Sequence, residues 1–160
     1  MLNIKIIAIG DLKERYLRDA CDEYKKRLGS WARVEEIVLK EEKLPDNPSG
    51  AQIKAGLEAE EKKILEKISP KAYVIAMCVE GKQLSSEELA KKISDVTLSG
   101  YGEIVLIIGS SFGMTENVKS RANFRLSVSK LTFPHQLLRV ILYEATYRAM
   151  SILNGTKYHK

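Results

Sequence analysis

The fold class is indicated most directly by residues 103–113, which read Glu-Ile-Val-Leu-Ile-Ile-Gly-Ser-Ser-Phe-Gly. A short apolar run that ends in a glycine-rich turn is typical of a strand covered on both faces of a sheet. Residues 4–9 and 73–79 are similarly apolar, and the first of these runs turns at Gly10. Helical patterns separate the runs. We therefore expect an α/β fold with a mainly parallel central sheet flanked by helices.

The expected helices are signalled by apolar periodicity and by capping residues. The first helix has apolar side chains at every fourth position, namely Leu12, Tyr16, Ala20, Tyr24 and Leu28. Two later helices are preceded by capping boxes, in which Ser49 is followed by Gln52 and Ser85 by Glu88. The remaining expected elements are strands at 33–39 and 124–128 and helices at 116–121 and 135–153.

The composition is that of one folded domain covering residues 1–160. With 44% hydrophobic and 29% charged residues, such a chain can bury a core without disulfides or a structural metal. Lys and Arg total 26 against 21 Asp and Glu, and the net charge of +5 favours a polyanionic partner. Cys21 and Cys78 lack CxxC spacing, so no zinc site is indicated. No signal peptide or membrane-length apolar run is present, so we expect a cytoplasmic protein without membrane or metal.

A first candidate ligand site is the turn from Gly109 to Gly113. Glycines allow a backbone to approach a ligand closely, and ligands of α/β proteins bind at the carboxyl ends of parallel strands. The turn lacks the Lys-Ser/Thr of a phosphate-binding loop and the GxGxxG of a dinucleotide fold. A ligand loop and a plain tight turn therefore both remain open.

A second candidate is the segment from Ser127 to Arg139, which joins the last strand to the long helix. Pro134 suits a first helical turn and leaves free backbone N–H groups that can face a ligand. The alternative is that His135 is an ordinary residue of that turn. Arg139 lies on a mostly apolar helix, so we expect it to meet a carboxylate, a partner subunit or RNA phosphate.

The long helix and the tail that follows it suggest partners. The helix is apolar on several faces, which predicts a second packing partner, and a twofold homodimer is the commonest arrangement. The tail from Thr156 to Lys160 combines lysines with Tyr158 and His159. Such a tail is either a frayed end or a segment that stacks on RNA bases and meets phosphate.

Together these segments resemble the RlmH family, the ribosomal RNA large subunit methyltransferase H proteins. The resemblance spans the chain and rests on Ile-Ile-Ala-Ile-Gly10, Gly81-Lys-Gln-Leu-Ser-Ser-Glu87, Ile-Ile-Gly109, Leu-Thr-Phe-Pro-His135, Arg139-Val140, Tyr147-Arg-Ala149 and Tyr158-His-Lys160. It implies a SPOUT fold with a C-terminal trefoil knot and a homodimer. It further implies S-adenosylmethionine-dependent methylation of N3 of a pseudouridine in the intersubunit stem-loop of 23S ribosomal RNA, on the assembled ribosome.

The resemblance also implies site residues. It places S-adenosyl-L-methionine at Met77, Gly109, Val128, Ser129, Lys130, Leu131, Thr132 and Phe133. Family members often have a second glycine where this chain has Ser110. Neutralising the anion that develops as N3 loses its proton needs a cation or a hydrogen-bond donor, for which Arg139 is the first candidate. His135, Tyr158 and His159 are candidates for the base or for positioning it.

Two other classes of protein remain open from the residues alone. A non-catalytic ribosome-binding factor would account for the net charge and the basic tail. A nucleotide- or flavin-binding α/β enzyme would use the turn from Gly109 to Gly113 for phosphate. Binding of S-adenosylmethionine separates both classes from a methyltransferase.

Overall fold

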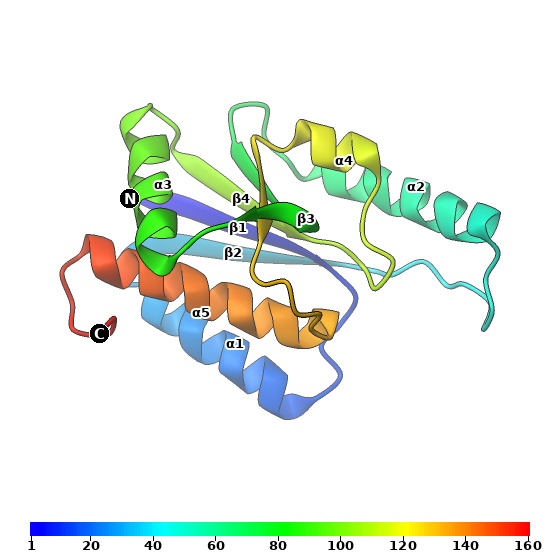
Figure 1. Cartoon of the computed structure of the whole chain (residues 1–160), viewed down its shortest axis with the longest axis horizontal. Helices are drawn as coiled ribbons and strands as arrows, with labels where there is room; N and C mark the ends of the chain where they lie inside the picture. The colour runs from blue at the N-terminus through cyan, green and yellow to red at the C-terminus, as the bar shows by residue number, and fades with distance from the viewer.

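The structure is a computed structural model that describes residues 1–160. Its elements are β1 (Leu2–Ile9), α1 (Arg15–Leu28), β2 (Ala32–Leu39), α2 (Gly50–Glu66), β3 (Tyr73–Gln83), α3 (Ser86–Leu98), β4 (Glu103–Ile108), α4 (Glu116–Arg121), β5 (Phe124–Ser127) and α5 (His135–Leu153). All strand pairs are parallel and form one sheet in the order β2-β1-β4-β3-β5 (Figure 1). The expected α/β fold with a parallel sheet is confirmed.

Helices cover both faces of the sheet (Figure 1). Successive side chains of a strand point to opposite faces, and β1 divides accordingly. Ile4, Ile6 and Ala8 pack in the cluster that contains buried residues of α1, α3 and α5. Ile7 and Ile9 belong to the second cluster, with residues of α2 and α4. The apolar run of β1 is therefore explained by burial on both sides.

The expected apolar face of α1 is partly wrong. The helix begins at Arg15, and its buried residues are Leu17, Cys21 and Leu28. Tyr16, which the four-residue spacing placed inside, is 70% exposed. Two rows of side chains at helical spacing end at Leu28, one through Tyr16 and one through Leu17. The row through Leu17 is the buried one, because this side of α1 packs against α5.

The edge formed by β3 and β5 contains an irregularity that shapes the surroundings of the site. β3 extends to Gln83, beyond the expected end at Val79, while β5 ends one residue early at Ser127. Met77 and Lys82 both pair with Leu126, so the residues between them bulge out of the ladder. A side chain at Gly81 would lie 2.7 Å from the backbone of Leu126. Glycine is therefore required where β5 passes this bulge.

The structure contains no helix with the length and apolar character needed to cross a membrane. Cys21 and Cys78 are both buried free thiols. Nowhere do three or more His, Cys, Asp or Glu side chains gather as metal ligands would.

Candidate active site

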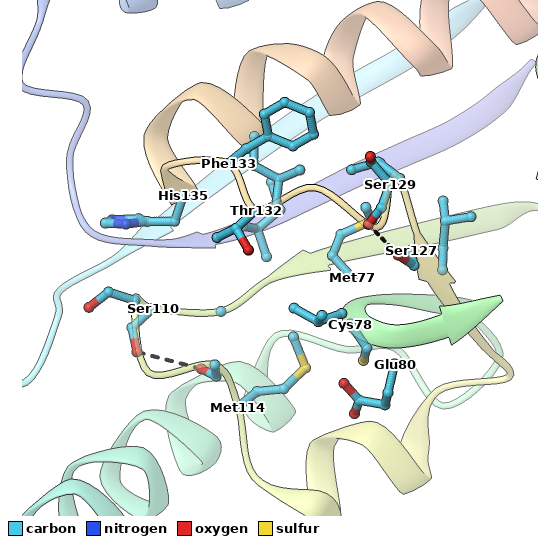
Figure 2. Close-up of a pocket in the computed structure, with 18 of the residues that line it drawn as sticks. Met77, Cys78, Glu80, Ser110, Met114, Ser127, Ser129, Thr132, Phe133 and His135 are labelled. Carbon is cyan, nitrogen blue, oxygen red and sulfur yellow. Dashed lines mark hydrogen bonds between the residues drawn. The ribbon is translucent and has the colours of Figure 1, made fainter. Parts of the chain in front are cut away.

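A cavity of about 510 Å³ opens at the carboxyl ends of β3, β4 and β5. Three segments surround it: the end of β3, the turn after β4 and the loop between β5 and α5. Figure 2 shows Met77 and Cys78 of β3 between the turn that carries Ser110 and the loop that carries Thr132 and Phe133. This is the edge at which ligands of parallel sheets bind.

The cavity brings together most of the residues that the resemblance assigned to the cofactor. The lining includes Met77, Gly109, Val128, Ser129, Leu131, Thr132 and Phe133. Lys130 is the only member of that set outside the lining. His135, on the first turn of α5, also faces the cavity.

The turn after β4 is closed on itself. Ser110 donates its amide to the carbonyl of Gly113 at 3.2 Å, and the Gly113 amide donates back at 2.8 Å. A Cβ atom at Gly109 would lie 2.4 Å from the Gly113 carbonyl oxygen. Gly109 is thus required by the turn itself. A Gly109→Val change would disrupt the turn, so a loss of ligand binding in that variant would not by itself show that Gly109 contacts the ligand.

The loop between β5 and α5 is held by serine side chains. The Ser127 hydroxyl donates to the carbonyl of Ser129 at 3.1 Å, as Figure 2 shows, and the Ser129 hydroxyl accepts from the Leu131 amide at 2.9 Å. The loop then enters α5 through Pro134, and no side chain caps this helix start. Leu131 remains 73% exposed although it lines the cavity. The loop therefore contributes apolar surface to the cavity, and the first backbone amides of α5 have no side-chain cap.

Several lining residues were not anticipated from the sequence. Cys78, Glu80 and Lys119 line the cavity, and Lys119 donates to Glu80 at 2.5 Å. This hydrogen bond lowers the pKa of the Glu80 carboxyl, whereas burial raises the pKa of the Cys78 thiol. Lys119 lies 39 residues after Glu80, and no local pattern joins them. Half of the lining residues are hydrophobic, which suits a ligand with an apolar planar part.

Arg139 does not reach the cavity. The residue is 2% exposed and donates to the backbone carbonyls of Gly10, at 2.6 Å, and Ile9, at 3.4 Å. Its Nε atom has no hydrogen-bond partner. Within the chain, Arg139 therefore meets backbone carbonyls at the end of β1 and forms no ion pair with a carboxylate, so that part of the expectation is wrong. Its contact with a partner subunit or with RNA phosphate stays a prediction.

The tail also lies outside this cavity and packs at the opposite end of α5 (Figure 1). The ring of Tyr158 meets Tyr147 edge-on at 4.7 Å, and its hydroxyl donates to Glu144 at 3.0 Å. His159 bridges Arg148, at 3.2 Å, and Glu87 of α3, at 2.8 Å. Burial raises the pKa of Tyr158, and so do its hydrogen bonds with Tyr24 and Glu144. The tail is therefore anchored by aromatic and polar contacts.

Comparison with known proteins settles the family. A family model described as "Predicted SPOUT methyltransferase" matches residues 2–159. The chain belongs to the SPOUT methyltransferase family. The cavity at the carboxyl edge of a parallel sheet is consistent with a methyltransferase of this family.

Relatives of this SPOUT methyltransferase share its whole length. The protein named "Ribosomal RNA large subunit methyltransferase H" from Streptococcus thermophilus (strain CNRZ 1066) is 50% identical over 99% of this chain and 100% of its own. The protein of the same name from Clostridioides difficile (strain 630) is 48% identical over the same shares. The resemblance to the RlmH family is thus confirmed.

A solved structure supports the fold alone. A probable methylase family protein from Haemophilus influenzae Rd KW20 superimposes with a TM-score of 0.56 at 14% identity. The match covers 99% of this chain and 71% of that one.

Proposed function

We propose that this chain transfers a methyl group from S-adenosyl-L-methionine to N3 of a pseudouridine in the intersubunit stem-loop of 23S ribosomal RNA, acting on the assembled ribosome in the cytoplasm. The observation that carries the proposal is the cavity formed by the turn after β4 and the loop from Val128 to His135. Relatives named as ribosomal RNA large subunit methyltransferases, at 48–50% identity, support the substrate class.

The cavity fits the methyl donor. Its volume of about 510 Å³ lies within the range of small-molecule sites. Met77, Leu131 and Phe133 would contact the adenine, and backbone groups between Val128 and Thr132 would satisfy its polar edge. The sulfonium supplies an activated methyl group when bound. The tasks of the protein are then to place N3 in line with that group and to remove the N3 proton.

His135 is our candidate for the residue that removes the N3 proton within the subunit that binds the cofactor. Of the four residues considered for catalysis, it is the only one that lines the cavity. A neutral imidazole has a ring nitrogen that can accept a proton, which suits a general base. Arg139 would act indirectly, because its hydrogen bonds to Gly10 and Ile9 hold α5 on the end of β1.

The active unit that we propose is a homodimer built on α5. The core-facing side of α5 includes Arg139, Leu142, Tyr143 and Thr146, all buried. Leu137, which is 38% exposed, and the half-buried Ile141 lie on the other side and pack in neither core cluster. A second copy of the chain that covers these side chains would bury the apolar surface that the core leaves exposed.

In the dimer, the tail of one subunit would reach the cavity of the other. Within one subunit the tail lies at the C-terminal end of α5 (Figure 1), and neither Tyr158 nor His159 lines the cavity. We propose that they approach the RNA at the cavity of the partner, where Tyr158 and His159 can stack on or position a base. The lysines of the tail would meet phosphate.

We further propose that residues 1–160 form one SPOUT domain whose C-terminal part is threaded as a trefoil knot. Two features support the threading. β5 pairs with β3 at the sheet edge, and the chain then returns along the cavity to α5, which packs against α1 and α3.

The proposed function is tested with ribosomes from a strain that lacks this gene. The protein should transfer labelled methyl from S-adenosylmethionine to these ribosomes but not to ribosomes from the parent strain, which already carry the modification. Digestion and mass mapping should place the label on a pseudouridine of 23S ribosomal RNA. Ribosome binding without affinity for S-adenosylmethionine would instead indicate a non-catalytic factor. Tighter binding of flavin mononucleotide or ATP would indicate a nucleotide-binding enzyme.

A further inference from the structure

An ion pair forms part of the cavity wall. Lys119 of α4 donates to the Oε1 atom of Glu80, on β3, at 2.5 Å. The lining contains no other Asp, Glu, Lys or Arg side chain. This pair therefore supplies the permanent charges that a bound molecule would meet, and a ligand that carries charge must be arranged around it.

Both partners are held in place by the fold. Glu80 lies in the bulge of β3 between Met77 and Lys82, and a bulge turns a side chain out of the ladder. Lys119 follows Val118, which is fully buried and fixes α4 in the second core cluster. The position of the pair is thus set by packed backbone on both sides.

The pair lies apart from the loop that we assign to the adenine. Figure 2 shows Glu80 and Met114 on one side of Cys78, with Thr132 and Phe133 on the other side. All of these residues line the same cavity. The cavity thus has an apolar end formed by the loop before α5 and a charged end formed by β3 and α4.

The pair can bind a further group without separating. Glu80 accepts its hydrogen bond from Lys119 at Oε1, so its Oε2 atom is available as an acceptor. An ammonium group has three protons, and Lys119 uses one of them for Glu80. The side chains of Glu80 and Lys119 are 54% and 21% exposed.

A zwitterion matches these two charges. S-adenosylmethionine carries an ammonium and a carboxylate on the same carbon atom of its amino-acid part. The ammonium is attracted to Glu80 and the carboxylate to Lys119, and both hydrogen bonds are between charged groups. A phosphate would meet the same lysine but would be repelled by the carboxylate beside it. The charged end of the cavity therefore favours an amino acid over a nucleotide phosphate.

We propose that Glu80 and Lys119 bind the amino-acid part of the methyl donor: Glu80 accepts from its ammonium, and Lys119 donates to its carboxylate. This inference rests on the proposed function of the cavity. It makes the two residues specificity determinants, which select adenosyl compounds that retain the amino acid over those that have lost it.

The test compares two ligands that differ only at this end. S-adenosylhomocysteine and methylthioadenosine share the adenosine and the uncharged thioether, but only the first carries the amino acid. Calorimetry measures both Kd values for the unchanged chain, Glu80→Gln and Lys119→Met, with methylthioadenosine as a competitor where its own heat is small. Glu116→Gln is the matched control, because Glu116 forms the neighbouring ion pair with Arg125, at 2.7 Å, and does not line this cavity. Circular dichroism checks that each variant is folded.

Each variant of the pair should raise the Kd for S-adenosylhomocysteine about three- to tenfold, because a charge-assisted hydrogen bond is lost at a partly exposed site. The Kd for methylthioadenosine should change less than about twofold, since that ligand does not reach the pair. Added salt should weaken binding of S-adenosylhomocysteine more in the unchanged chain than in either variant.

The outcomes separate this inference from the proposed function. Unchanged affinity for S-adenosylhomocysteine in both variants, or equal losses for the two ligands, would overturn the role of Glu80 and Lys119. Equal loss in the Glu116→Gln control would also count against it, because the effect would then be one of general surface charge. An unchanged chain that binds neither S-adenosylmethionine nor S-adenosylhomocysteine would overturn the proposed function itself.

Discussion

The guanidinium of Arg139 donates to the backbone carbonyl of Gly10 at 2.6 Å, across 129 residues of chain. Next to this contact, the amide of Lys13 donates to the Gln136 side chain at 3.1 Å. One turn further along α5, the Tyr143 hydroxyl donates to Glu36 of β2. These contacts hold the first turns of α5 on the end of β1 and on the middle of β2, and they thereby position His135 beside the cavity.

Arg139 should therefore matter first for stability. Arg139→Ala leaves buried carbonyls without donors and creates a cavity, so we expect it to lower the unfolding free energy by about 3 kcal/mol. Urea denaturation measures this loss. Arg15→Ala, which removes an arginine whose side chain is 86% exposed, should change stability little. An Arg139→Ala chain of unchanged stability that cannot methylate RNA would instead point to a direct role in the reaction.

The exposed side chain of Leu131 should contribute to cofactor binding. Leu131→Glu places a charge where the cavity offers apolar contact, and we expect S-adenosylmethionine affinity to fall about tenfold or more, in keeping with the loss of one buried leucine. Calorimetry measures the affinity. The control is Leu98→Glu, because Leu98 is 83% exposed and lies outside the cavity. Equal affinities for the two variants would remove the loop from the cofactor site.

The free side of α5 should form the subunit interface. Light scattering should report about twice the 18.0 kDa mass of the chain. Leu137→Glu combined with Ile141→Glu buries charges in the proposed interface and should yield a folded monomer. Tyr16→Glu, at a position that is 70% exposed on α1, should remain dimeric. A dimer that survives the double change would place the interface elsewhere.

The tail should be needed for methyl transfer but not for cofactor binding. A chain that ends at Gly155 loses the contacts of Tyr158 with Glu144 and Tyr147, which should cost about 1–2 kcal/mol of stability. It should still dimerise and bind S-adenosylmethionine, yet methylate ribosomes poorly, because stacking on RNA bases is lost.

Mixed dimers test whether the tail acts on the partner. A truncated chain retains an intact cavity, and a Leu131→Glu chain retains an intact tail. If the tail serves the partner, mixing the two should restore part of the activity, measured as labelled methyl on ribosomes. No restoration would mean that each tail serves its own subunit. Full activity of the truncated homodimer would show that the tail is dispensable.

The two thiols should be unreactive in the native protein. They should also lower its free energy of unfolding at alkaline pH. Burial raises the pKa of Cys21 from 9.0 to about 12, and it also raises the pKa of Cys78. A raised pKa favours the protonated thiol in the folded state, so this contribution is complete below pH 9 and is lost as pH rises toward 12. Urea midpoints should fall between pH 8 and pH 11, and Cys21→Ala should reduce that fall. At pH 8 a thiol reagent should label both cysteines only after unfolding.

Local patterns predicted most of the elements. The capping boxes at Ser49 and Ser85 are both formed as expected, because every group that takes part lies within three residues. The apolar runs became central strands because side chains buried on both faces must all be apolar. The segment from Ser127 to Arg139 was a candidate ligand site from its own residues, but its assignment to the cofactor came only from the family resemblance.

Tertiary structure alone decided which distant residues meet. Arg139 looked like a cation for a ligand, and no local pattern shows that the carbonyl of Gly10 accepts its hydrogen bond. The same holds for Lys119 of α4 with Glu80 of β3, and for Glu60 of α2 with the Glu42 amide in the loop after β2. Composition and periodicity report the environment of one element at a time, whereas the partners of a buried charge depend on the crossing of several elements. The sequence therefore determined the sheet and its helices. The shape of the site was determined by how the end of β3, the turn after β4 and the loop before α5 come together in the tertiary structure.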